Sequence, residues 1–183
     1  MPEHHPPETD TIVLDMVRKF SQERLAPHAA AREKAGAIEP EIIRELGELG
    51  IFGATTPAQW DGSEIDPVTY ALLLEEIAAG DGSVSTMVSV HNSPTCIIFD
   101  LYGTDAQKDR WLRPLATGEA VGSFALTEPQ AGSDASNLRT RAVKQAQQAG
   151  PSFSIYNPNS SERLSEVRCG GPIVARTRLK FAS

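Results

Sequence analysis

The chain has 183 residues, enough for one domain or for one domain and part of a second. Hydrophobic residues make up 40% and charged residues 22% of it, which is typical of a globular protein with a packed core. The net charge of -7 argues against a nucleic-acid partner, and no apolar run approaches the roughly 18 residues that a membrane span requires.

The first residues are polar and rich in proline, unlike a secretory signal or a mitochondrial presequence. We therefore expect residues 1–9 to be disordered. Two cysteines, Cys96 and Cys169, imply no disulfide framework. These features favour a cytoplasmic protein with reduced thiols.

From residue 10 to residue 120 the sequence predicts helix after helix. The first of these helices should stop before Pro27, because proline rarely continues a helix. Apolar residues recur at helical spacing over residues 10–25, 40–50, 66–80, 83 to about 94, and 104–118. Five helices with short links favour an antiparallel bundle.

Several of these helices carry recognisable boundary residues. Asp66 and Ser83 are predicted N-caps, because their side-chain oxygens can accept hydrogen bonds from the first helical turn. Thr104 and Gln107 stand at the spacing of a capping box. Pro94 should kink or shorten the helix that contains it, because proline lacks a backbone N–H.

The character of the sequence changes at residue 121. Residues 121–127, VGSFALT, are small and apolar and favour a strand, which Pro129 should end. We therefore predict a mainly α protein. An N-terminal antiparallel helical bundle domain occupies residues 10–120, and residues 121–143 contain the first strand or strands of a β domain.

Residues 124–134, FALTEPQAGSD, have the order expected of a binding loop. The predicted strand delivers Thr127 to its end, and a proline then forces a turn. Consecutive N–H groups beyond the turn, together with the Thr127 and Ser133 hydroxyls, suit an anionic oxygen such as a phosphate or a flavin carbonyl. Gly132 would let a ligand approach the main chain. An ordinary strand and turn is the alternative, because glycine-containing loops are common.

This segment resembles the signature of the acyl-CoA dehydrogenase family, roughly A-x-T-E-P-x-A-G-S-D. Three further motifs resemble the helical N-terminal domain of that family in order and spacing: LEEIAAGDGS at 74–83, SVHNS at 89–93 and YGTDAQKDRWLRPLATGE at 102–119. The resemblance covers about residues 10–143, in the style of bacterial short-chain (butyryl-CoA) dehydrogenases.

The resemblance implies FAD as cofactor and gives roles to five residues. Phe124, Leu126 and Thr127 match positions that line the isoalloxazine ring, and Thr127 hydrogen-bonds to it. Gly132 and Ser133 match the loop that touches the flavin and the acyl-CoA, with Ser133 close to both ligands.

The reaction that the resemblance implies is the α,β-dehydrogenation of an acyl-CoA thioester to an enoyl-CoA, in fatty acid metabolism. In the family a glutamate removes the α-proton while the β-hydrogen leaves as hydride to the flavin, whose chemistry the protein orients. Electrons then pass to an electron-transfer flavoprotein, and members form homo-oligomers. Residues 88–94 match the helix wall that meets the acyl chain. A flavin oxidase or monooxygenase of the same superfamily is an alternative.

No residue of this chain matches the α-proton base. Family members continue with a β domain, which packs a segment like L-N-G-x-K-x-W-I-T-N on the flavin, and then with a helical domain that carries the catalytic glutamate. Neither pattern follows Val143. Glu128 belongs to the signature but not to that role. We therefore expect a truncated enzyme, with a catalytically inert fragment or pseudogene product as the alternative.

Residues 144–183 differ from the rest of the chain. Residues 1–143 hold 11 Lys and Arg against 22 Asp and Glu, whereas residues 144–183 hold 6 against 2. Helical periodicity disappears at the same place, so we predict an irregular C-terminal tail, either frameshifted or disordered. The alternative is a genuine but divergent tail. In that case residues 173–181, in which apolar and polar residues alternate, form one strand.

Other chemistry-bearing residues have simpler interpretations. His91 lies on the apolar stripe of its helix without metal-ligand spacing to another candidate, which favours a hydrogen-bonded core or cleft-facing histidine over a catalytic one, and no metal site. Glu75 and Glu76 are adjacent on a helix and point in different directions. Cys96 is interpreted as a small buried hydrophobic residue.

Overall fold

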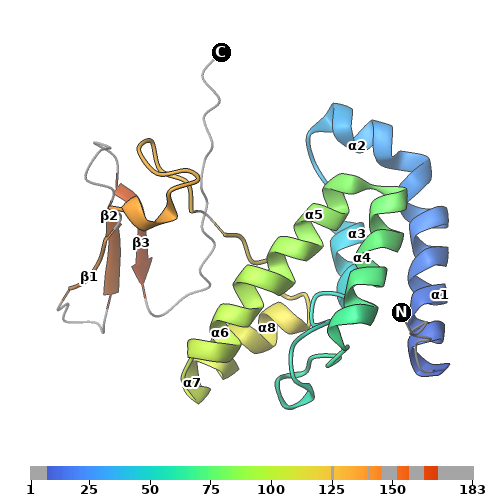
Figure 1. The fold of residues 1–183 in the computed structure, drawn as a ribbon, viewed down its shortest axis with the longest axis horizontal. Helices are drawn as coiled ribbons and strands as arrows, with labels where there is room; N and C mark the ends of the chain where they lie inside the picture. Colours follow the sequence, from blue (N-terminus) through green and yellow to red (C-terminus); the bar gives the residue numbers. More distant parts are fainter. Residues whose placement is uncertain (1–7, 125, 140, 146–151, 157–162, 169–183) are drawn as a thin grey trace. The chain divides into compact units, whose positions relative to one another are not determined.

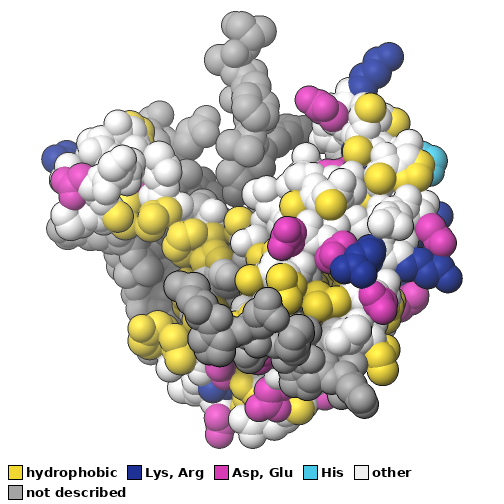
Figure 2. Space-filling model, turned by 45° about the vertical axis from the view of Figure 1, so that its right-hand side comes forward, with side chains coloured by type: hydrophobic (Ala, Val, Ile, Leu, Met, Phe, Trp, Pro, Cys, Tyr) yellow, Lys and Arg dark blue, Asp and Glu magenta, His cyan; other side chains and the backbone are white. Residues whose placement is uncertain are grey.

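The computed structural model describes residues 8–124, 126–139, 141–145, 152–156 and 163–168. The chain forms two compact units, residues 1–124 and residues 125–183 (Figure 1). In its described part, no helix is long and apolar enough to cross a membrane. On the face shown in Figure 2, acidic, basic and hydrophobic side chains are intermixed at the surface.

The first unit consists of helical runs, several of which change between α, π and 3-10 geometry along their length. In chain order they are α1 (Glu8–Phe20), η1 (Ser21–Leu25), η2 (Ala26–His28) and α2 (Ala29–Ala35); α3 (Pro40–Glu48); η3 (Ala58–Trp60); α4 (Pro67–Gly80); α5 (Gly82–Val90), η4 (His91–Cys96) and α6 (Ile97–Tyr102); and α7 (Asp105–Gln107), η5 (Lys108–Leu112) and α8 (Arg113–Ala116).

Capping residues explain most of the helix boundaries. Asp66 caps α4, because its carboxylate accepts hydrogen bonds from two N–H groups of the first turn. Thr104 and Gln107 form a reciprocal capping box at the start of α7. Gly118 follows α8 with a φ of 79°, in the left-handed region that favours glycine. The predicted cap at Asp66 and the predicted capping box are confirmed.

Three boundaries differ in detail from the sequence-based expectation. The cap of α5 is Asp81 rather than Ser83, because the Asp81 carboxylate accepts from the N–H groups of Ser83 and Val84 at 2.9 and 3.2 Å. The first helical run continues through Pro27, which lies in the first turn of the 3-10 helix η2, where no N–H is needed. Pro94 lies inside the π-helical η4, so the local disruption is a change of helix type and not an end.

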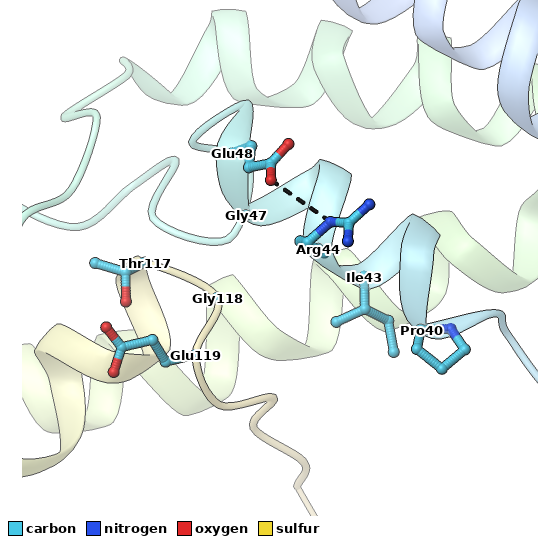
Figure 3. A pocket seen from close by; sticks show the side chains of 8 residues that line it. All are labelled: Pro40, Ile43, Arg44, Gly47, Glu48, Thr117, Gly118 and Glu119. Carbon is cyan, nitrogen blue, oxygen red and sulfur yellow. Dashed lines mark ion pairs between the residues drawn. The ribbon is translucent and has the colours of Figure 1, made fainter.

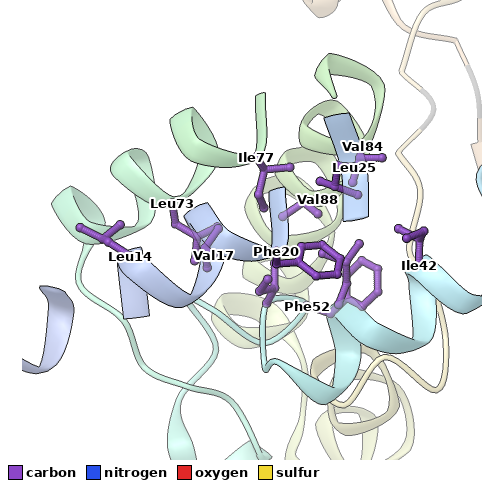
Figure 4. Close-up of a cluster of buried hydrophobic side chains, with 12 residues drawn as sticks. Leu14, Val17, Phe20, Leu25, Ile42, Phe52, Leu73, Ile77, Val84 and Val88 are labelled. Carbon is purple, nitrogen blue, oxygen red and sulfur yellow. The ribbon is translucent and has the colours of Figure 1, made fainter. Parts of the chain in front are cut away.

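The main core of the first unit lies between α1, α3, α4 and α5 (Figure 4). Helix α4 packs against both α1 and α5. The fully packed side chains of this core are Leu14, Val17, Phe20, Leu25, Ile42, Leu46, Ile51, Phe52, Leu73, Ile77, Val84 and Val88. A second cluster joins Cys96 to Leu112 and Leu115, so the interpretation of Cys96 as a buried hydrophobic residue is confirmed.

A buried ion pair joins α2 to the cap of α5. The Arg32 side chain is 2% exposed, and its guanidinium donates to Asp81 at 2.8 Å and to Glu39 at 2.6 Å. It also donates to the carbonyl oxygens of Leu25 and Arg24, both at 2.9 Å. The charge is therefore paired and hydrogen-bonded, the condition under which burial of a charge is tolerated.

The second unit contains a small antiparallel sheet with the strand order β1-β2-β3. Its regular elements are η6 (Ala135–Asn137), β1 (Arg141–Gln145), β2 (Ser152–Tyr156) and β3 (Arg163–Arg168). In the register, Arg141 is opposite Tyr156, and Ser152 is opposite Arg168.

The mainly α fold, with a helical bundle followed by strands, is confirmed, and β1 begins at Arg141, inside the predicted range 121–143. The strand expected over 121–127 is not observed. The described residues of 121–127 have no strand geometry, since a strand needs a partner for its N–H and C=O groups and the described residues supply none. Strands β2 and β3 lie in the tail that was expected to be irregular. The alternative strand over 173–181 and the expected disorder of residues 1–7 lie outside the described residues, whereas Glu8 already belongs to α1.

Candidate functional site

Residues 126–139 form a loop built on a tight turn. The N–H of Glu128 donates to the carbonyl of Ala131 at 2.9 Å, and the N–H of Ala131 donates to the carbonyl of Glu128 at 3.1 Å. Pro129 and Gln130 occupy the corner, where the fixed φ of proline suits the first position. The turn that the sequence places at the proline is therefore present.

The Glu128 side chain holds this loop together. Glu128 is 7% exposed, and its carboxylate accepts hydrogen bonds from the N–H of Arg139 at 2.9 Å and from the Gln130 side chain. The carbonyl of Gln130 accepts from the Asn137 amide at 3.3 Å. A buried carboxylate that satisfies donors of its own loop has a structural role, in agreement with its exclusion as a base.

The five predicted flavin contacts are exposed. Phe124 is 45% and Leu126 41% exposed, so both leave apolar surface available to a flat ring. Thr127, Gly132 and Ser133 are exposed as well. Phe124 ends the first unit and the other four residues belong to the second.

No neighbouring atoms crowd the main chain at Gly132. A Cβ built at this position would have no heavy atom within 4 Å, and the backbone is not in the left-handed region. The local fold therefore does not require glycine here. The missing side chain instead leaves the N–H groups of Gly132 and Ser133 accessible, and in the described part of the chain they donate to no acceptor. These residues fit a flavin or another ligand with acceptor oxygens.

The helix wall predicted over residues 88–94 combines the end of α5 with the start of η4. Val88, His91 and Asn92 are buried, so they cannot touch a ligand directly. The half-buried positions, which could do so, are Ser89, Val90, Ser93 and Pro94.

His91 uses both ring nitrogens inside the first unit. Its Nε2 lies 3.1 Å from the carbonyl oxygen of Leu115, and its Nδ1 lies 3.0 Å from the backbone nitrogen of Gly122. A carbonyl only accepts and a backbone N–H only donates, so the ring is neutral with its proton on Nε2. Burial lowers the pKa of His91 to about 4. Of the two predicted positions, core and cleft-facing, the structure shows the core, because His91 is fully buried. The sequence does not predict the hydrogen bond to Gly122.

Asn92, for which the sequence predicts no role, hydrogen-bonds the segment at Ile51 to helix α5. Its side-chain amide donates to the carbonyl of Ile51 at 2.9 Å and to that of Val88 at 3.1 Å. The signal in the sequence is weak, because only a polar residue on an apolar helix stripe indicates it.

A shallow pocket of about 380 Å³ lies beside the end of α3 and the turn after α8 (Figure 3). It is lined by Pro40, Ile43, Arg44, Gly47, Glu48, Thr117, Gly118 and Glu119. Arg44 and Glu48 form an exposed ion pair at 3.5 Å, and none of the predicted site residues contributes to the pocket. Among the described residues, no cluster of His, Cys, Asp or Glu could hold a metal ion.

Residues 7–119 match the family model of the acyl-CoA dehydrogenase N-terminal domain. The chain belongs to the acyl-CoA dehydrogenase family. The resemblance seen in the sequence motifs is thereby confirmed, and the family is one of FAD-dependent oxidoreductases.

Comparisons with individual proteins agree with this family assignment. An acyl-CoA dehydrogenase of Bacillus subtilis is 36% identical over 140 residues, which are 76% of this chain and 37% of the relative. The butyryl-CoA dehydrogenase of Megasphaera elsdenii has a TM-score of 0.72 at 33% identity, covering 83% of this chain and 40% of that one. A glutaryl-CoA dehydrogenase of Mycobacterium smegmatis in complex with FADH2 has a TM-score of 0.72 at 30% identity, with coverages of 82% and 38%. The chain thus spans well under half the length of these relatives.

Proposed function

We propose that this chain supplies the N-terminal helical domain and the signature loop of an FAD-dependent acyl-CoA dehydrogenase, which converts acyl-CoA thioesters to enoyl-CoA. The observation that carries the proposal is the signature loop. It is closed by its own turn and by the buried Glu128 carboxylate, and it leaves Gly132 and Ser133 open to a ligand.

In this proposal Phe124 and Leu126 offer apolar surface to the flavin ring and Thr127 hydrogen-bonds to it. Gly132 and Ser133 contact the cofactor from the loop, and Ser133 also contacts the acyl-CoA. Bound FAD would supply the redox chemistry by accepting a hydride. The residues of this chain bind and orient, and none of them is assigned as the α-proton base.

Three further parts of the proposal rest on the family alone: an acyl-CoA substrate, an electron-transfer flavoprotein as electron acceptor and a homo-oligomeric state. The proposed cytoplasmic location rests instead on the sequence features of this chain. A catalytically inert fragment or pseudogene product is the rival interpretation, because no residue of this chain matches the α-proton base.

The substitution Gly132→Ala tests the proposed cofactor loop. The added Cβ meets no atom within 4 Å, so we expect an unchanged melting temperature. FAD titrated into the full chain should bind about tenfold more weakly than to the unsubstituted chain, because the methyl group stands where the ligand approaches the main chain. The matched control is Gly82→Ala, whose Cβ also meets nothing within 4 Å, and it should leave FAD binding unchanged.

The outcomes separate the rival interpretations. A chain that binds no FAD would support the inert fragment, and equal binding by Gly132→Ala would remove Gly132 from the site. The flavin should not bleach with butyryl-CoA, because the chain lacks an assigned base. Bleaching would contradict that assignment, and oxygen consumption without an added electron acceptor would favour a flavin oxidase.

A further inference from the structure

The backbone that leads from the helical unit to Phe124 is held at Gly122. The N–H of Gly122 donates to Nδ1 of His91 at 3.0 Å. Between Gly122 and Glu128, the described residues make no further hydrogen bond. The contact with His91 is therefore the last polar anchor before Phe124, which lies two residues further along the chain.

The His91 ring is itself fixed from the opposite side. Its Nε2 donates to the carbonyl of Leu115 at 3.1 Å, and this carbonyl also accepts from the N–H of Gly118 at 3.1 Å. The ring packs against Phe52 with the two ring centroids 4.6 Å apart. His91 is fully buried, so neither water nor another rotamer can substitute for these contacts without repacking.

The main chain at Gly122 packs directly on η4. A Cβ at this position would overlap with Cγ2 of Thr95 and would lie 3.2 Å from Cδ2 of Leu115. Thr95 is held in place because its hydroxyl donates to the carbonyl of Val90 at 3.1 Å. Glycine is therefore needed for the N–H to come within reach of Nδ1, and this steric requirement is independent of the hydrogen bond itself.

We propose that His91 is a positioning residue for the cofactor site: by accepting the Gly122 N–H, its ring sets where the backbone leaves the helical unit and so where Phe124 is presented. The importance of Phe124 for FAD rests on the proposed function. The positioning itself involves only residues of the first unit.

A matched pair of substitutions separates this role from simple packing. In His91→Asn, the side-chain oxygen can stand near the position of Nδ1 and keep an acceptor for Gly122. In His91→Gln, the amide nitrogen can stand near the position of Nε2 and keep the donor to Leu115, but the acceptor is lost. Both replacements are neutral amides that remove the ring.

The first readout is independent of flavin. In the isotope-labelled full chain, the Gly122 amide should exchange with solvent about tenfold faster in His91→Gln than in His91→Asn, because the partly buried hydrogen bond to residue 91 is lost. The ring signals of Phe124 should shift in His91→Gln and stay near their original positions in His91→Asn. Equal exchange and equal Phe124 signals in the two variants would overturn the proposal.

The second readout is FAD affinity. It should fall about tenfold in His91→Gln and be retained in His91→Asn, in line with the loss of one partly buried hydrogen bond. Gly122→Ala should also weaken FAD binding, because the overlap with Thr95 displaces the same segment, while Gly82→Ala serves as the control. If the unsubstituted chain binds no FAD, the proposed function fails, but the Gly122 exchange and the Phe124 signals still decide the role of His91.

A direct measurement covers the case in which both His91 variants unfold. A scalar coupling between the Gly122 amide nitrogen and Nδ1 of His91 is transmitted only through the hydrogen bond that joins them. Its detection in the unsubstituted chain supports the anchor, and its absence in a folded sample overturns the proposal.

Discussion

At the scale of single residues, buried polar side chains hold parts of the first unit that are distant in sequence. His91 joins η4 to the end of α8 and to Gly122, and Arg32 joins α2 to the cap of α5. Both side chains are almost fully buried, so each depends on partners that satisfy its hydrogen bonds.

The buried neutral state of His91 should make stability depend on pH. Burial lowers its pKa from the usual 6.5 to about 4, so the unfolded chain takes up a proton more readily than the folded chain. The stabilisation is complete above about pH 6.5 and is lost as the pH falls towards 4, with about 2 kcal/mol gone at pH 5. Urea unfolding at pH 7 and pH 5 measures this loss. In His91→Asn the unfolding free energy should differ less between pH 7 and pH 5 than in the unsubstituted chain. If the two differences are equal, His91 is not the cause of the pH dependence.

Arg32 should contribute far more to stability than a surface arginine. Arg32→Ala leaves Asp81 buried without its partner, and we expect the free energy of unfolding to fall by about 3–5 kcal/mol. Arg24 is the matched control: its side chain is 48% exposed and pairs with Glu45, so Arg24→Ala should cost less than about 1 kcal/mol. If chemical denaturation shows a similar loss of unfolding free energy in both variants, the buried ion pair contributes no more than the exposed one.

At the scale of elements, the signature loop should depend on Glu128 without affecting the helices. Glu128→Ala removes the acceptor for the N–H of Arg139, and we expect the loop 126–139 to be destabilised by about 1–3 kcal/mol. Amide exchange should become faster in this loop while the core helices keep their protection. Ser133→Ala, at an exposed side chain, is the control. Unchanged exchange in Glu128→Ala would show that the loop has another support.

The helix boundaries also show how much of the fold could be predicted from the sequence alone. The caps at Asp66 and Thr104 were predictable, because a cap depends on residues within one helical turn. Asp81 replaces the predicted Ser83 as a cap because its carboxylate also pairs with Arg32, 49 positions away. The anchoring of Gly122 by His91 across 31 positions was beyond prediction for the same reason. Local signals in a sequence do not encode such partners.

The candidate site was predictable to a similar extent. The turn after Thr127 and the side-chain-poor loop follow from residue types alone, and the structure has both. The strand expected over 121–127 depends on a pairing partner, which the apolar pattern of those residues cannot supply. The roles of the five proposed flavin contacts stay predictions.

At the scale of the whole molecule, exposed apolar side chains should cause association. On α6, Ile97 and Ile98 are 39% and 42% exposed, and Leu101 and Tyr102 are 65% and 80% exposed. Adjacent apolar surface of this kind promotes association. Light scattering should show a mass that rises with protein concentration, and Leu101→Lys combined with Tyr102→Lys should reduce the rise. A doubly substituted chain that associates as strongly as the original would place the contact elsewhere.

The main hydrophobic cluster has a consequence for the order of events during synthesis. Every fully packed member of that cluster lies between Leu14 and Val88. Ribosomes add about 5–20 residues per second, and N-terminal parts of a chain generally fold first. The cluster can therefore assemble before the signature loop has left the ribosome. Errors in the later part of the chain therefore need not prevent this cluster from forming.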